Sequence, residues 1–359
     1  MEGRAQVSKV VQPEADVLGT PPTGRTGAGG IWPRLRRAAG TVALQREATV
    51  LVVVVLLIVY FGFISSIGRS TFFTSVNIIN VSQIAAPIMI IAIGEVLLLI
   101  CGEIDLSPGF VYLFAPFLMH YLIDFYGFPV IVAILVVLVM GLAVGWVNGF
   151  LTVTLGLPSF IATLGTGFIL YGITLTTSNA TQASIPTAAI GIGKWIGSYS
   201  YAEIIWGLVL VAIFHVILTR TRWGLHTIAT GSNLLGAREA GINVARIKYG
   251  SFMITGVLGA FVGLQIAFQT SVIDPSSGGY QPMFYSVAAA VIGGTAMLGG
   301  SGTIIGAFLG SVMLAVLTDG FDVVGVSAYP LNTIFGAAIL IAMIANVQLA
   351  RLRATGRRR

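Results

Sequence analysis

Residues Asn77–Ile100, NIINVSQIAAPIMIIAIGEVLLLI, give the clearest indication of the fold class of this protein, because they contain a single charged side chain, Glu95. An apolar run of about 20 residues is long enough to cross a bilayer as an α-helix, because the hydrocarbon core is about 30 Å thick. The run is too long and too uniformly apolar for the strand of a membrane β-barrel. The sequence therefore predicts a helical membrane span here.

The rest of the chain has the same character. Of its 359 residues 56% are hydrophobic and 9% are charged, and the mean hydropathy is +0.94. A soluble globular protein has about 25% charged residues, so this chain cannot cover a water-facing surface. A soluble enzyme, a nucleic-acid-binding protein and a disordered scaffold are excluded.

Ten apolar segments agree with the roughly ten spans that the apolar content allows at about 20 residues each. They are Thr49–Ser66, Asn77–Ile100, Phe110–Ile123, Pro129–Val153, Pro158–Thr176, Ala202–Leu218, Tyr249–Gln269, Tyr285–Leu298, Thr303–Leu317 and Pro330–Val347. The predicted fold class is an all-α integral membrane protein with about ten transmembrane helices, some of them broken.

Positive charges gather in three blocks. Of the 19 Lys and Arg, seven precede residue 47, five lie from Arg220 to Lys248 and five from Arg351 to Arg359. Short segments rich in Lys and Arg stay in the cytoplasm. Six and then four predicted spans separate the blocks, and both numbers are even, so all three blocks and both termini are expected inside.

These blocks also define the predicted organisation. Residues 1–48 are expected to be a disordered cytoplasmic tail, 49–350 the transmembrane domain with a cytoplasmic loop at 220–248, and 351–359 a basic cytoplasmic tail. The lone Cys101 has no partner for a disulfide.

Two segments are predicted to break helices inside the membrane. The first, GEIDLSPG at Gly102–Gly109, holds Glu103, Asp105 and Ser107. Asp105 or Ser107 is expected to cap the next helix with Pro108 in its first turn, and acids this close to a span suggest a function.

The second break is expected at the doublets Gly293–Gly294 and Gly299–Gly300. Unwound backbone at membrane depth is tolerated only where it is buried or lines a cavity. Gly302, Gly306 and Gly310, spaced by four, favour close backbone approach between helices, and tight packing alone is the alternative interpretation.

The middle basic block contains GSNLLGAREAGINV at Gly231–Val244. Asn233 is expected to start a short exposed helix that carries Arg238 and Glu239, and Gly241 to end it. So short a helix is not stable alone in water, which favours a partner surface that receives it. An ordinary interfacial turn is the alternative.

Four motifs in this order resemble the permeases of bacterial ABC importers for ribose, xylose and galactosides, over about residues 77 to 347. They are GEIDLSPG, PSFIATLGTGFILYG at Pro158–Gly172, GSNLLGAREAGINV and VIGGTAMLGGSGTIIG at Val291–Gly306. The resemblance implies a fold like that of the vitamin B12 importer permease. It also implies a second permease copy or homologue, a substrate-binding protein, and ATP-binding cassette subunits that hold ATP and Mg²⁺, in a bacterial cytoplasmic (inner) membrane. The chain departs from the family pattern at Pro108, Leu235 and Gly236.

No cofactor or ATPase site is expected in this chain. It has no phosphate-binding G-x-x-x-x-G-K-[ST] motif, and His120, His215 and His226 are isolated, without the spacing of metal ligands. The chain is therefore interpreted as a transport subunit rather than an enzyme.

Three groups of site residues are predicted. Gly231, Asn233, Arg238, Glu239 and Gly241 are expected to dock on the ATPase. A pathway for neutral sugars needs hydroxyl, amide and aromatic groups, for which Asn148, Ser159, Thr163, Thr166 and Tyr171 are candidates, although the stripe of Ser159, Thr163 and Thr166 could equally serve packing. Three loops are expected on the outer face: Ser178–Tyr201, Ser271–Phe284 and Gly320–Tyr329. Asp274 in the second loop and Asp322 at the third are expected to orient the binding protein by charge, with plain solvated loops as the alternative.

Two other functions stay open. The first is an ABC permease for branched-chain amino acids or nucleosides, although a zwitterion would need paired opposite charges at membrane depth, and the sequence suggests none. The second is an ion-coupled carrier that uses Glu95, Glu103 and Asp105 as coupling carboxylates. A neutral monosaccharide, a pentose or hexose, is the preferred substrate, while the sugar itself and the choice between homodimer and heterodimer are left undecided.

Overall fold

The computed structural model describes residues 46–65, 68–276 and 280–325, with a few single positions between 333 and 344. In this part of the chain almost every residue is helical, and eight helices are long and apolar enough to cross a membrane. The predicted all-α multi-pass fold is confirmed. The predicted tails and the span Pro330–Val347 lie outside the described residues, apart from those few positions and the start of α2 at Arg46.

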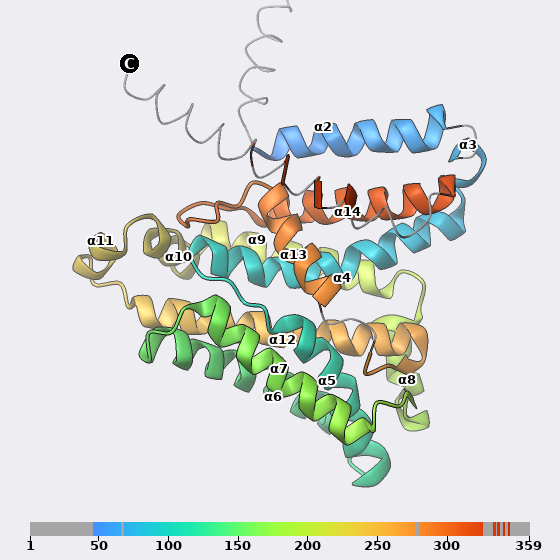
Figure 1. The fold of residues 1–359 in the computed structure, drawn as a ribbon, viewed down its shortest axis with the longest axis horizontal. Coiled ribbons are helices and arrows are strands. Elements are labelled where there is room, and N and C mark those ends of the chain that lie inside the picture. The colour runs from blue at the N-terminus through green and yellow to red at the C-terminus, as the bar shows by residue number, and fades with distance from the viewer. Residues whose placement is uncertain are drawn as a thin grey trace, which may run out of the picture. The chain divides into compact units, whose positions relative to one another are not determined.

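Figure 1 shows the helices as a bundle whose long axes run roughly side by side. In chain order the elements are α2 Arg46–Val59, η1 Tyr60–Ile64, α3 Gly68–Thr71, α4 Ser75–Ile100, α5 Pro108–His120, η2 Tyr121–Phe125, α6 Val130–Gly149, η3 Phe150–Thr154, α7 Ser159–Ser178, β1 Ala183–Ser184, η4 Thr187–Ala189, α8 Ile190–Gly193, η5 Lys194–Ser198, α9 Ala202–Arg220, α10 Arg222–Ser232, α11 Leu234–Glu239, α12 Val244–Thr270, β2 Val272–Ile273, α13 Tyr280–Ile292 and α14 Ile304–Val324.

Helix α4, which includes Asn77–Ile100, forms the centre of the bundle. It packs against α9, α12, α13 and α14, and every residue from Ala85 to Ile100 is buried. A helix that is apolar on all sides is stable only when other helices surround it, as here. The outer helix α6 instead exposes Ile131, Leu135 and Val139 along one face, which suits contact with lipid.

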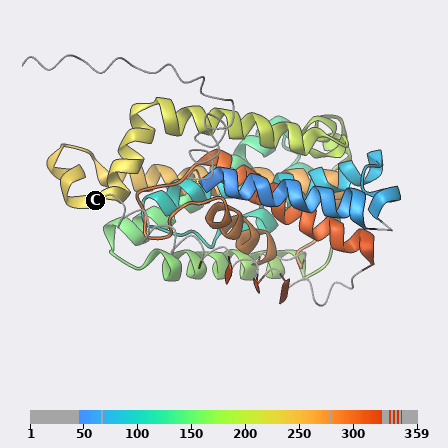
Figure 2. The same ribbon diagram turned by 90° about the horizontal axis from the view of Figure 1, so that it is seen from above.

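The observed order of helices agrees with the charge pattern. Six long helices, α2, α4, α5, α6, α7 and α9, separate the first basic block from the middle one, where α10 and α11 lie. Figure 1 shows α10 and α11 at one end of the bundle and α8 at the other, and in Figure 2 the same two helices, in gold, project from that end. Because the middle basic block is predicted to face the cytoplasm, we call these the cytoplasmic and outer ends.

The predicted span Tyr285–Leu298 is wrong in both bounds. Helix α13 has 13 residues, so it is about 20 Å long and shorter than the hydrocarbon core. Residues 293–303 then follow without helix before α14 begins at Ile304. Gly299 and Gly300 lie in this segment with φ of 89° and 81°, a conformation that glycine adopts without strain, so the predicted break is present.

Close approach between α13 and α14 depends on small residues, as predicted. A Cβ atom at Gly306 would lie 2.1 Å from the Gly293 carbonyl oxygen, and one at Gly310 would lie 2.1 Å from that of Ala289. The third member of the predicted stripe, Gly302, precedes the helix. The two backbones therefore touch where the stripe faces α13.

At the outer end, strands β1 and β2 join two loops that the sequence left separate. Ala183 pairs with Ile273 and Ser184 with Val272 in an antiparallel ladder. The predicted third loop starts too early, because α14 continues through Gly320 to Val324. Gly320 packs on the ring of Phe61, and the helix ends only at Gly325, whose φ is 80°.

Candidate functional site: the cytoplasmic segment and the two helix breaks

The short helix predicted in the cytoplasmic loop is present as α11. The Asn233 side chain accepts a hydrogen bond from the Gly236 amide at 2.9 Å and so caps the helix, and Gly241 follows it with φ of 78°. Arg238 and Glu239 are both exposed. The local structure is as expected, and the docking role of these residues stays a prediction.

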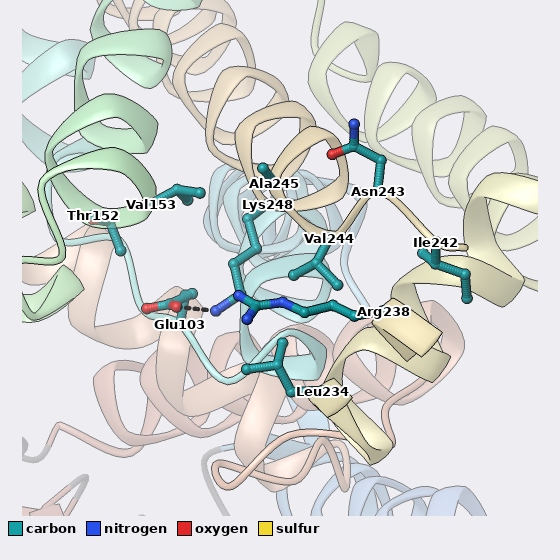
Figure 3. Close-up of a pocket in the computed structure, with 10 residues that line it drawn as sticks. All are labelled: Glu103, Thr152, Val153, Leu234, Arg238, Ile242, Asn243, Val244, Ala245 and Lys248. Carbon is teal, nitrogen blue, oxygen red and sulfur yellow. Dashed lines mark hydrogen bonds and ion pairs between the residues drawn. The ribbon is translucent and has the colours of Figure 1, made fainter. Parts of the chain in front are cut away.

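A pocket of about 470 Å³ lies beside this helix, between α11, the start of α12 and the first break. Figure 3 shows Lys248 and Glu103 paired inside it, with the Arg238 side chain reaching in from α11. Both side chains of the ion pair are largely buried. Arg238 and Lys248 against Glu103 leave this pocket with an excess of one positive charge.

Lys248 is a residue that the sequence interpretation missed. It lies 145 residues from Glu103 in the chain, so no spacing rule connects the two. The sequence suggested no paired opposite charges at membrane depth, and the structure adds one pair, Glu103 with Lys248, in the pocket beside α11. The one available signal was a lysine next to the start of an apolar span, facing an acid next to the end of another.

The cytoplasmic segment meets the second helix break and, at Ile100, the end of the helix that precedes the first break. The Gly300 amide donates to the Ile100 carbonyl oxygen at 2.8 Å, and the Ser232 hydroxyl donates to the Gly300 carbonyl oxygen at 3.2 Å. A Cβ atom at Gly231 would lie 1.6 Å from the Ile100 oxygen. The last turn of α10, the end of α4 and the second break therefore meet at one point, which we call the glycine junction (Gly231, Ile100 and Gly300).

The first break runs from Cys101 to Ser107, between α4 and α5. Asp105 and Ser107 are fully buried, and the Asp105 carboxylate accepts the Ser107 amide at 2.8 Å. Ser107 occupies the cap position of α5, but no side chain caps this helix, so the capping expectation is wrong for both residues, and Asp105 instead closes a turn within the break. Pro108 begins the helix as expected. Asn148 donates to the Ser107 hydroxyl at 2.8 Å.

The predicted polar stripe on α7 holds this break in place. The Ile104 amide donates to Ser159 Oγ at 3.3 Å and the Leu106 amide to Thr163 Oγ1 at 3.0 Å. Four helical residues cover about 6.0 Å and two extended residues about 6.6 Å, so hydroxyls at i and i+4 match alternate amides. One step further along, Thr166 donates to Asn148 Oδ1 at 2.6 Å.

This arrangement brings four of the five predicted pathway residues together around the break. Asn148 and Thr163 are fully buried, whereas Ser159, Thr166 and Tyr171 are partly exposed. The Tyr171 ring packs 5.9 Å from that of Phe110 at the start of α5 rather than on the polar network. Their role in a pathway stays a prediction.

The acids of the outer end lie far from this site in the fold. Asp274 accepts hydrogen bonds from the Ser276 hydroxyl at 2.7 Å and from Gln182 at 2.9 Å. These bonds, that of Ser276 above all, hold the pKa of Asp274 below its ordinary value. Asp322 lies exposed on the last turn of α14.

The three carboxylates considered for ion coupling have different surroundings. Glu103 is paired with Lys248, and Asp105 is bonded within the break. Glu95 is fully buried in α4, and its side chain has no hydrogen-bond partner among the described residues.

Comparison with known proteins agrees with this architecture. The profile of a family described as "Branched-chain amino acid transport system / permease component" matches residues 77–344. The xylose/arabinose import permease of Sulfolobus acidocaldarius is 36% identical over 77% of this chain and 79% of its own length. The ribose import permease of Escherichia coli K12 is 30% identical, over 80% of this chain and 90% of its own.

An autoinducer 2 import system permease of Photorhabdus luminescens is 29% identical over 84% of this chain and 89% of its own length. No solved structure matches the chain, so the expected likeness to the vitamin B12 importer permease stays a prediction. The family profile covers about three quarters of the chain, including both helix breaks, the α7 stripe and the cytoplasmic segment. This multi-pass membrane protein belongs to that family of transport-system permease components.

Proposed function

We propose that this chain is the membrane-spanning permease subunit of an ATP-driven importer for a neutral monosaccharide, a pentose or hexose. The glycine junction carries the proposal, because it links a cytoplasmic helix directly to the second break and to the end of the helix that precedes the first. Relatives named for xylose and arabinose or for ribose support a sugar over a branched-chain amino acid.

The energy comes from partner chains. ATP and Mg²⁺ bind to ATP-binding cassette subunits in the cytoplasm, and α11 docks in a cleft of such a subunit through Arg238 and Glu239. When the ATPase closes, it moves α11 and α10, and the contact between Gly231 and Ile100 passes this motion to both breaks. The positive pocket beside α11 suits an acidic side chain of the ATPase.

The remaining partners follow from the same assembly. A second permease copy or homologue completes the transporter in the cytoplasmic membrane, and a substrate-binding protein docks on the outer end. Asp274 and Asp322 steer that docking by charge. Neutralising both should weaken docking and remove its salt dependence, and unchanged docking would leave them as solvated acids only.

The pathway passes beside the first break, next to Thr166 and Tyr171. Both are partly exposed and lie in the middle turns of α7. Asn148, Ser159 and Thr163 position the break from the same side. A cysteine at Thr166 should react with a water-soluble thiol reagent in at least one nucleotide state. A cysteine at Thr163 should react only when the break moves, and inertness of both in every state would show that the stripe serves packing alone.

Reconstitution tests the function. Vesicles that hold this chain, its ATPase subunits and internal ATP should take up a labelled pentose or hexose only when the binding protein is present outside. The binding protein should be stabilised against heat by that sugar and not by leucine or a nucleoside. Uptake of leucine instead would overturn the substrate class. Gradient-driven uptake by this chain alone would make it an ion-coupled carrier.

A further inference from the structure

A second polar pocket lies at the outer end of the same bundle, away from every residue used above except Asp322. It has a volume of about 450 Å³, and besides Ile84 and Val323 its lining is polar: Asn77, Asn80, Gln83, Gln269, Asp319 and Asp322. The volume is within the range of about 300–1,000 Å³ that small-molecule sites occupy. Four carboxamides and two carboxylates in one place are unusual for a chain that is 56% hydrophobic.

Helix geometry brings these side chains together. Asn77, Asn80 and Gln83 lie at intervals of three on the first turns of α4, so they share one face of that helix. Asp319 and Asp322 lie three apart on the last turns of α14, which packs against α4. A stripe of carboxamides therefore faces a pair of acids.

The inner wall of this pocket is already organised. Asn77 and Asp319 are each 4% exposed, and Asn77 Nδ2 donates to Asp319 Oδ2 at 2.6 Å and to the Phe72 carbonyl oxygen at 3.1 Å. These bonds fix the orientation of both side chains before any ligand arrives, which lowers the cost of binding.

The groups nearer the rim are left with free hydrogen-bonding capacity. Among the described residues, the side chains of Asn80, Gln83, Gln269 and Asp322 make no hydrogen bond to protein, and Asn80 and Asp322 are exposed. Each carboxamide offers both donors and an acceptor, and each carboxylate offers acceptors only. This set matches a ligand whose groups donate and accept at once, such as the hydroxyls of a sugar.

The charge of the pocket narrows the ligand class. In the described part of the chain no Lys or Arg lines it, so a phosphate or the carboxylate of an amino acid would meet two acids and no cation. A neutral polyhydroxylated molecule avoids this repulsion.

We infer that the outer pocket between α4, α12 and α14 is a low-affinity entry site for a neutral polyol, which receives the sugar when the binding protein releases it. The inference rests on the proposed function and adds a site to it. Asp322 then contacts substrate at the rim as well as steering docking.

The test measures binding to this chain alone, in nanodiscs and without the binding protein. Saturation-transfer NMR is recorded with D-xylose, D-ribose or L-leucine, each at millimolar concentration. A further sample contains D-xylose together with calcium ions, which would compete for the two carboxylates. We expect sugar signals with the natural chain, a loss of at least fivefold in an Asn80→Leu, Gln83→Leu variant, and no signal with leucine. Gln182→Leu, a matched change of a carboxamide at the same end but outside the pocket, should keep the signal.

Uptake by the reconstituted transporter separates the possible failures. The double variant should lower sugar uptake several-fold while the binding protein docks as tightly as before and basal ATP hydrolysis is unchanged. Equal sugar signals in the variant and the natural chain would overturn the entry site while leaving the proposed function intact. Signals with leucine alone, accompanied by leucine uptake, would overturn the proposed function. If calcium ions at the same ionic strength as a sodium chloride control abolish the sugar signal, the pocket is a cation site instead.

Discussion

Replacing Gly231 with alanine tests the link between the cytoplasmic segment and the membrane. In the last turn of a helix this change alone would stabilise the protein by about 0.5–1 kcal/mol, because alanine is the better helix former. The new Cβ atom, however, would lie 1.6 Å from the Ile100 carbonyl oxygen and 2.7 Å from the Gly300 amide nitrogen. Real Cβ contacts are essentially never shorter than 3.0 Å, so α10 and the end of α4 must separate by at least 1.4 Å.

That movement separates the three partners of the glycine junction. Overpacking of this kind costs about 1–3 kcal/mol, and loss of the bond between the Gly300 amide and Ile100 costs about 1 kcal/mol more. The clash therefore exceeds the gain in helix propensity. We expect Gly231→Ala to lower the free energy of unfolding by about 1–3 kcal/mol and the thermal midpoint by several degrees.

The functional assay follows ATP hydrolysis and uptake together in vesicles that contain the ATPase subunits and the binding protein. Gly231→Ala should lower the amount of substrate moved per ATP several-fold. Gly250→Ala is the matched control, since Gly250 is helical, lies near the same end, and a Cβ atom there meets only the Trp223 ring at 3.6 Å. If Gly231→Ala has the thermal midpoint and the coupling ratio of this control, the junction does not transmit motion.

Three further changes address other contacts. Gly241→Val places a β-branched residue at φ of 78°, which costs about 1–2 kcal/mol of conformational strain. It should uncouple ATP hydrolysis from uptake while the protein still inserts in the membrane, and normal coupling would contradict the docking role of α11. Lys248→Ala should lower the free energy of unfolding by more than the roughly 1 kcal/mol of a surface ion pair, because it leaves Glu103 largely buried without its partner. The charge exchange Glu103→Lys with Lys248→Glu should restore part of this loss in thermal unfolding, and no recovery would argue against a charge interaction. The folded-state pKa of Asp274 is lowered, so its negative charge is present above the ordinary pKa of about 4 and is lost only as the pH falls through the lowered pKa. The contribution of Asp274 to docking should therefore persist down to about pH 4 and vanish in Asp274→Asn. Loss of docking between pH 6 and 5 would assign the effect to another group.

Part of this architecture follows from local sequence alone. Apolar length predicted α4 within two residues of its start, because the hydrophobic thickness of a bilayer imposes a minimum run. The charge blocks predicted the even number of helices before α10. The breaks at Gly102–Gly109 and at Gly299–Gly300 were also predictable, since glycine and proline act on the backbone through their own dihedral preferences.

Helix lengths near the second break were not predictable in the same way. Hydropathy joins Tyr285–Leu298 into one segment, whereas the chain ends α13 at Ile292 and continues as irregular backbone. Burial among neighbouring helices makes that irregular segment tolerable, and burial of this kind is a property of the whole bundle. The same holds for Gly320, which stays helical because Phe61 covers it.

Local sequence is enough to predict a multi-pass helical membrane protein and the two segments where helices break, because lipid demands long apolar runs and glycine and proline interrupt them. That the middle basic block faces the cytoplasm stays a prediction of the charge rule. The contacts of the polar residues, in contrast, are set by the packing of helices against one another. This packing pairs Glu103 with Lys248, uses Ser159 and Thr163 to hold the first break, and gathers the carboxamides of α4 opposite Asp319. These contacts join residues tens to hundreds of positions apart, and their energies depend on distances that only packing sets.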